Sequence, residues 1–67
     1  MHSKQVVHYI DLIRCEVGLR ATLIPVDHPS NLVVNGERSI TSMVLSYDRE
    51  TGIIETMNTI YKPVRSE

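Results

Sequence analysis

Hydrophobic and polar residues alternate along much of this chain, which is typical of strands with one buried face. The clearest case is 20–26, which predicts a strand with Ala21, Leu23 and Pro25 on one face. Proline has no N–H for a ladder hydrogen bond, so we expect this strand to lie at an edge or to carry a bulge at Pro25. The next residues, 27–31, combine Asp, Pro, Ser and Asn and predict a turn.

Residues 5–19 fit two interpretations. As a strand, every second residue from Val7 to Leu19 shares one apolar face, interrupted only by Asp11. As a helix, the apolar stripe has a 4-3-4 spacing, between the candidate caps Ser3 and Gly18. Val and Ile supply fifteen residues and Ala only one, and β-branched side chains fit strands better than helices. We therefore favour the strand, and the helix stays open.

Two turn sequences predict hairpins. Residues 32–34 lead into Asn35-Gly36, the pair favoured in a type I′ turn. Residues 38–47 and 53–62 flank the loop 48–52, in which Gly52 is suited to the left-handed conformation. Pro63 ends the last strand, and 64–67 is expected to be a loose tail.

A specific register is expected for the second hairpin. If Tyr47 lies opposite Ile53, Met43 faces Met57 and Thr41 faces Thr59, so that like side chains meet across the strands. Strand 39–47 is then apolar on both faces. One face carries Met43, Leu45 and Tyr47, and the other carries Ile40 and Val44. In so small a protein, we expect one of these faces to meet a second subunit or a partner.

The predicted fold class is mainly β, with four to five short strands in a small antiparallel sheet or barrel and one N-terminal helix as the alternative for 5–19. We expect a single domain over 1–67. A chain of this length buries only about 60% of the surface that its unfolded form exposes, and this one has no Phe or Trp. The shortage of core favours a homodimer or a larger symmetric assembly.

The cysteine content and the hydropathy of the chain indicate where in the cell the protein is expected. Cys15 is the only cysteine, which excludes an internal disulfide and fits a reducing compartment, so we expect a cytoplasmic protein. No uncharged run is longer than nine residues, and no basic-then-apolar leader begins the chain. We therefore expect neither a membrane span nor a signal peptide.

Three groups of residues resemble catalytic or metal-binding sets, and each has a simpler explanation. Asp27-His28-Pro29-Ser30 holds the residue types of a hydrolase triad, but sequence neighbours rarely reach that geometry, so we interpret it as a turn. The histidines and Cys15 match no zinc spacing. Asp48, Glu50 and Glu55 lie near a solvated turn. We predict no catalytic residue, no metal and no cofactor, and a small hydrolase or metal-binding protein is the least favoured alternative.

Charge weighs against nucleic acid as a partner. Seven basic and eight acidic residues give a net charge of -1, whereas nucleic-acid clamps usually carry a basic excess. Small barrels nevertheless bind single strands through aromatic and basic side chains. A small-barrel nucleic-acid binder or regulator that uses Tyr47, Tyr61 and Arg38 is therefore the second hypothesis.

The segments 41–48 and 51–61, with Asp27-His28-Pro29-Ser30 upstream, resemble short uncharacterised proteins of bacterial and phage or prophage origin. The resemblance covers about half of the chain and transfers no catalytic residue. It implies a small β protein of a mobile element, and such accessory proteins commonly act by binding a larger host protein.

The leading hypothesis is a non-enzymatic interaction module, a homodimer that binds and modulates, for example inhibits, a host protein complex through sheet edges or a mixed apolar face. The residues expected to bind the partner are Met43, Leu45, Tyr47, Met57, Tyr61 and Arg38.

Overall fold

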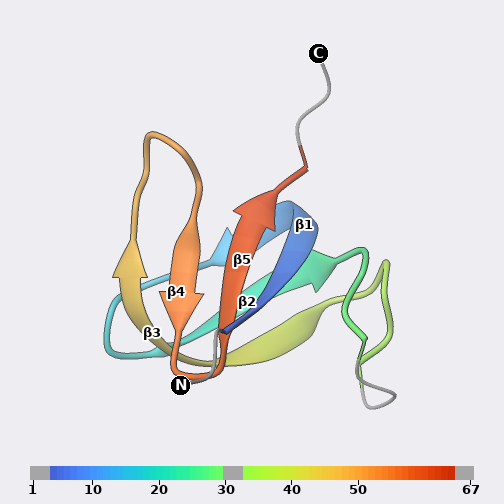
Figure 1. Cartoon of the computed structure of the whole chain (residues 1–67), viewed down its shortest axis with the longest axis horizontal. Coiled ribbons are helices and arrows are strands. Elements are labelled where there is room, and N and C mark those ends of the chain that lie inside the picture. Colours follow the sequence, from blue (N-terminus) through green and yellow to red (C-terminus); the bar gives the residue numbers. More distant parts are fainter. Residues whose placement is uncertain (1–3, 30–32, 65–67) are drawn as a thin grey trace.

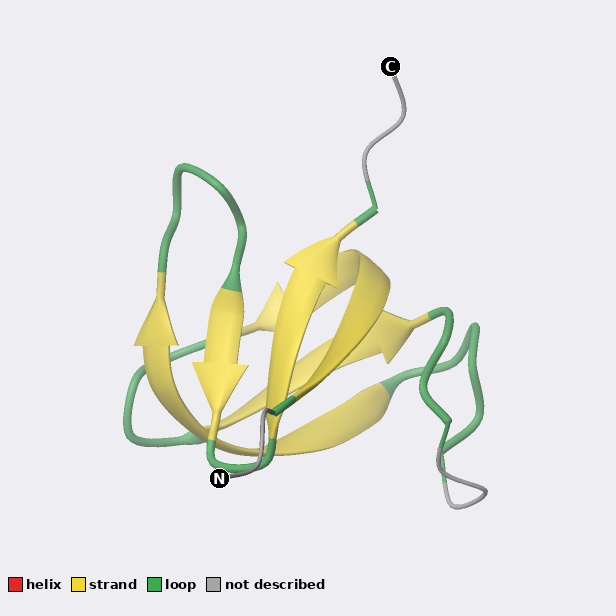
Figure 2. Cartoon of the chain, viewed as in Figure 1, coloured by secondary structure: helices red, strands yellow, loops and turns green. Residues whose placement is uncertain are grey.

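The computed structural model describes residues 4–29 and 33–64, which form five strands closed into a barrel (Figure 1). The strands are β1 (Gln5–Arg14), β2 (Arg20–Pro25), β3 (Ser39–Tyr47), β4 (Ile54–Thr56) and β5 (Thr59–Pro63). Within the described residues there is no helix (Figure 2). The predicted β class is confirmed, and the helix alternative for 5–19 is not seen.

The strands run up and down around the barrel in chain order. Each consecutive pair is antiparallel. With an odd number of alternating strands, the first and last point the same way, so β1 and β5 close the barrel as a parallel pair from Gln5 opposite Thr59 to Tyr9 opposite Pro63. Every strand therefore has two neighbours.

Two β-bulges in β1 set which of its side chains face the interior. The register against β2 leaves Ile10 and Ile13 as extra residues. Each extra residue shifts the alternation by one position. The side chains packed in or against the core are Val7, Tyr9, Leu12 and Cys15. The expected single apolar face from Val7 to Leu19 is therefore wrong as a continuous face: Cys15 still packs against the core, but three of its members are exposed, namely Ile13, Val17 and Leu19. The bulge expected at Pro25 lies in the partner strand, where Ile10 is inserted beside the Tyr9–Pro25 pair.

β3 is bulged in the same way. Leu45 is an extra residue against β4, and two residues, Thr41 and Ser42, stand opposite the single Ala21 of β2. The inward positions are consequently three apart, at Thr41, Val44 and Tyr47. The predicted grouping of Tyr47 with Met43 and Leu45 on one face is therefore wrong, because those two side chains lie outside.

The second hairpin has the predicted register beyond the Leu45 bulge, where Val44 pairs with Thr56, but differs from it by one residue at the loop end. Tyr47 pairs with Ile54 instead of Ile53. The predicted strand 53–62 is also divided into β4 and β5 by a turn at 57–58. The hydroxyl of the fully buried Thr56 holds this turn, because Oγ1 accepts from the Thr59 N–H at 3.0 Å and donates to the Thr59 carbonyl at 2.9 Å. Gly52 has φ of +78°, as predicted.

Asn35-Gly36 forms a turn but not the predicted type I′ hairpin. The Glu37 N–H donates to the Val34 carbonyl across it at 3.3 Å. Gly36 has φ of +89°, whereas no non-glycine residue described has positive φ, which is the pattern of a type II turn. Residues 33 and 34 are not in a strand, and Leu32 lies outside the described residues. Gly36 instead ties the loop to the barrel, because its N–H donates to the Pro25 carbonyl at 2.7 Å.

The core is small. Among the described residues, Pro25 is buried, and seven hydrophobic ones form the buried core: Val7, Tyr9, Ala21, Leu23, Val44, Ile54 and Tyr61. Three buried threonines share it: Thr41, Thr56 and Thr59. β5 ends at Pro63 as predicted, the Val64 N–H donates to the Tyr9 carbonyl at 2.9 Å, and 65–67 lie outside the described residues. Ser30 and Asn31 of the predicted turn also lie outside them.

Candidate functional site

The six residues predicted to bind a partner do not share one surface. Met43, Leu45 and Met57 are 44%, 47% and 57% exposed. Arg38 is exposed and precedes β3 instead of belonging to it. By contrast, the other two side chains belong to the interior, since Tyr47 packs against the core and Tyr61 lies within it.

The exposed methionines and Leu45 adjoin two further apolar residues on the outside of the barrel. Val17 and Leu19 of the β1–β2 connection are 63% and 51% exposed. Backbone hydrogen bonds join these segments: the Val44 N–H donates to the Leu19 carbonyl at 2.9 Å, and the Met57 N–H donates to the Met43 carbonyl at 3.0 Å. We call Val17, Leu19, Met43, Leu45 and Met57 the methionine patch.

The tyrosines are structural. Tyr9 and Tyr61 are each 5% exposed, and burial raises the pKa of both phenols. The Tyr9 hydroxyl donates to the Gly52 carbonyl at 2.5 Å, which ties the β3–β4 loop to β1. A ring buried on both faces cannot stack on a nucleic-acid base. Tyr61 is therefore not available for stacking, and the half-buried Tyr47 alone does not make the exposed aromatic pair that the nucleic-acid hypothesis needs.

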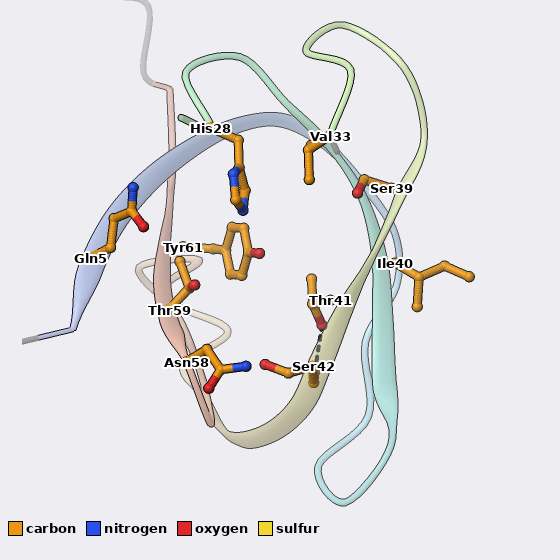
Figure 3. Close-up of a pocket in the computed structure, with 10 residues that line it drawn as sticks. All are labelled: Gln5, His28, Val33, Ser39, Ile40, Thr41, Ser42, Asn58, Thr59 and Tyr61. Atoms are coloured by element: carbon orange, nitrogen blue, oxygen red, sulfur yellow. Dashed lines mark hydrogen bonds between the residues drawn. The ribbon is translucent and has the colours of Figure 1, made fainter. Parts of the chain in front are cut away.

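A pocket of about 310 Å³ opens beside the first half of β3 (Figure 3). It is lined by Gln5, His28, Val33, Ser39, Ile40, Thr41, Ser42, Asn58, Thr59 and Tyr61. The start of β5 forms the opposite side, and the β2–β3 loop adds His28 and Val33. Thr41 and Thr59, predicted to face each other as strand partners, both line this pocket without being paired.

Neutral polar groups dominate the pocket. Eight of its ten lining residues carry a hydroxyl, amide or imidazole group, and none carries a carboxylate, ammonium or guanidinium group. The Thr41 hydroxyl accepts from the Ala21 N–H at 3.0 Å and donates to the Ser42 carbonyl at 2.6 Å. The rings of His28 and Tyr61 lie 6.4 Å apart, tilted by 40°. The two apolar members differ in direction, since Ile40 points away from the pocket in Figure 3.

The Asp27 carboxylate bonds to His8, on β1. The Asp27 carboxylate accepts from the His8 backbone N–H at 2.6 Å, and its other oxygen lies 2.8 Å from His8 Nδ1. These bonds to His8, the backbone one first, lower the pKa of Asp27. The His28 backbone N–H donates to Asn35 Oδ1 at 2.8 Å, and Ser30 lies outside the described residues. The residues therefore hold the loop in place, as a turn does.

The carboxylates of the β3–β4 region are separate. Asp48 Oδ1 accepts from the Glu50 N–H at 2.9 Å inside the loop, whereas Glu55 lies 2.6 Å from the Lys4 ammonium. Over 4–29 and 33–64, no group of three His, Cys, Asp or Glu residues could hold a metal ion. Cys15 packs against the core, and burial raises the pKa of its thiol.

No protein-family model, curated protein or solved structure matches this chain. A search of the described residues for a helix long and apolar enough to cross a membrane finds none. Sequence reasoning identified three of the five patch residues but missed Val17 and Leu19, and it did not single out the pocket. The clustering of Ser, Thr and Asn at 39–42 and 56–59 was the available signal for the pocket.

Proposed function

We propose that this protein is a non-enzymatic interaction module that forms a homodimer and docks onto a partner protein through the methionine patch. The resemblance to short phage and bacterial proteins gives this role a concrete form: an accessory protein of a mobile element, acting in the cytoplasm, that binds and inhibits a host protein.

The observation that carries the proposal is the exposure of five apolar side chains on three segments that backbone hydrogen bonds join, on a barrel with so small a core. Exposed apolar groups that lie together mark interaction surfaces, whereas scattered ones need no explanation. A two-fold interface must be complementary to itself. An uncharged apolar patch meets that condition, and a net charge of -1 adds little repulsion between copies.

The expected strength of self-association follows from the patch residues. Fully burying an exposed Val, Leu or Met side chain contributes roughly 1.5–3 kcal/mol. The five residues are 44–63% exposed, so a two-fold interface with both copies of the patch gains on the order of 10 kcal/mol. Association itself costs about 4–15 kcal/mol. We therefore expect a weak dimer whose population depends on concentration.

Sedimentation of the purified protein from micromolar to millimolar concentration tests the proposal. The native chain should gain mass with concentration, and the double variant Leu45→Lys with Met57→Lys should remain a monomer. Ile10→Lys is the matched control, because Ile10 is as exposed as Met57 at 57% but lies outside the patch. Circular dichroism should show all three folded.

Two outcomes would contradict the proposal: a native protein that is monomeric at millimolar concentration, or a double variant that still dimerises. Binding of a single-stranded oligonucleotide that weakens steeply with added salt would instead favour the nucleic-acid hypothesis, because released counterions set that slope.

A further inference from the structure

The barrel wall is incomplete beside the first half of β3. β4 is only three residues long and pairs with β3 from Val44 to Tyr47. Ser39–Ser42 therefore have β2 on one side and no paired strand of the described residues on the other. The pocket occupies this second side (Figure 3). Roughly every second main-chain N–H and C=O group of a strand points to each side, so this segment presents main-chain groups to the pocket.

Side chains around the pocket are also available to a ligand. Within the described part of the chain, those of Gln5, Ser39, Ser42 and Asn58 make no hydrogen bond, whereas the Thr41 hydroxyl already makes two. Figure 3 shows the Asn58 and Ser42 side chains directed toward each other across one end of the pocket. Each amide and hydroxyl both donates and accepts, so the lining suits an occupant rich in both kinds of group.

The occupant's class follows from what the lining lacks. The lining has no carboxylate, ammonium or guanidinium group, and His28 is its one basic side chain, so the pocket offers little to balance a phosphate, a carboxylate or a cation. Small-molecule sites are mostly apolar and often aromatic, with few polar groups, but this lining is mostly polar and its Tyr61 ring is 5% exposed. An extended peptide, whose main chain alternates donors and acceptors, matches an unpaired strand beside neutral hydroxyls and amides.

We propose that the pocket is a strand-addition site, where an extended, uncharged segment of a partner protein pairs with Ser39–Ser42 and hydrogen-bonds to Asn58 and Gln5. Four residues of β3 span about 13 Å, so the paired segment has about four residues. The segment's inward side chains must be small and uncharged, because they would lie against Thr41, Thr59 and Tyr61. This site extends the proposed protein-binding role to a second surface, which borders the methionine patch where Ser42 adjoins Met43 and Asn58 adjoins Met57.

Amide NMR titration of the isotope-labelled full chain tests the site. The probes are acetylated and amidated hexapeptides that alternate Thr with Val or Ser, at millimolar concentration. We expect saturable shifts in 39–42 and 58–61, and at least a tenfold weaker effect from peptides with Glu or Lys at alternate positions. Peptides that are N-methylated at alternate main-chain nitrogens should not bind when the methylated nitrogens are the ones that would donate to β3. Equal binding of the N-methylated peptides, shifts elsewhere on the barrel, or no shift with any peptide would overturn the proposal.

Two variants locate the site. Asn58 is exposed in the β4–β5 turn and lines the pocket, so Asn58→Trp should obstruct it. Glu50→Trp places the same ring in the β3–β4 loop, and this variant should bind the peptide like the native chain. The titration is repeated on the Leu45→Lys with Met57→Lys chain. If this double variant still binds the peptide, the strand-addition site does not depend on the methionine patch. The two proposals can then be tested independently of each other. Undiminished binding by Asn58→Trp would contradict the assigned position.

Discussion

Gly52 joins two distant parts of the chain at a single residue. Its φ of +78° is the left-handed conformation, and a Cβ there would lie 2.9 Å from Pro63 Cγ and 3.1 Å from the Tyr9 hydroxyl. Gly52→Ala should therefore combine backbone strain with crowding, and we expect it to cost about 2–4 kcal/mol of unfolding free energy. Gly36→Ala, at φ of +89° with nothing within 4 Å, is the matched control and should cost only the strain of about 1–2 kcal/mol. Urea unfolding measures both, and equal losses would contradict the close approach.

Asp27 supports a prediction about pH. Its bonds to His8 lower its pKa in the folded protein. A carboxyl whose pKa is depressed by folding stabilises the native state above its unfolded pKa of about 3.9, and this stabilisation is lost as the pH falls through the folded value. Asp27→Asn should therefore lower the unfolding free energy at pH 7, by at most about 1 kcal/mol because the pair is nearly half exposed.

The difference between native protein and Asp27→Asn should shrink as the pH falls below about 3.9, which urea unfolding at neutral and at acid pH can measure. Asp11→Asn changes an exposed carboxylate of β1 for which no hydrogen bond is found, and it should show little difference at pH 7. A native-to-variant difference for Asp27 that persists unchanged in acid would exclude the hydrogen bonds of its carboxylate to His8 as the source.

At the scale of the strands, sequence patterns identified most of the strands but not which of their side chains face the core. The β-branched run in 5–14, the alternation in 20–25 and the Gly52 turn predicted strands and a hairpin that are present. Pro25 indicated a bulge nearby, but the inserted residues themselves were not predictable, because Ile10 and Leu45 carry the same kind of side chain as ordinary strand positions. A bulge is fixed by the path of the neighbouring strand. For this reason the pocket and two patch residues were missed while three patch residues were found.

The bulge of β3 depends on one hydroxyl. Two residues of β3 oppose Ala21, and Thr41 Oγ1 replaces the missing ladder acceptor for the Ala21 N–H. Thr41→Val keeps the shape but leaves a buried N–H without an acceptor, so we expect a loss of about 1–3 kcal/mol by urea unfolding. Thr41→Ser keeps the hydroxyl and should lose less. Thr22→Val, half-buried and with no side-chain hydrogen bond found, should change stability by less than about 0.5 kcal/mol; a similar loss at both sites would refute this role.

At the scale of the whole molecule, closure of the barrel depends on strands from opposite ends of the chain. β1 and β5 pair from Gln5 with Thr59 onward, and Lys4 reaches across to Glu55 at 2.6 Å. Pairing residues so distant in sequence has a large entropic cost before native contacts compensate for it. The only large side chain of β5 that is buried in the core is Tyr61, so we expect the closure to depend on it.

Replacing that ring should endanger the whole fold. A domain of this length is stable by about 3–10 kcal/mol, and removing a buried aromatic ring costs about 3–5 kcal/mol. Tyr61→Ala should therefore lose much of its cooperative urea transition and its dispersed amide spectrum, whereas Tyr61→Phe should keep both. Ile60→Ala, the adjacent half-buried position of the same strand, should lose clearly less. A Tyr61→Ala protein with the native midpoint would mean that the ring is not part of the core, and Tyr61 would again be available to bind a partner.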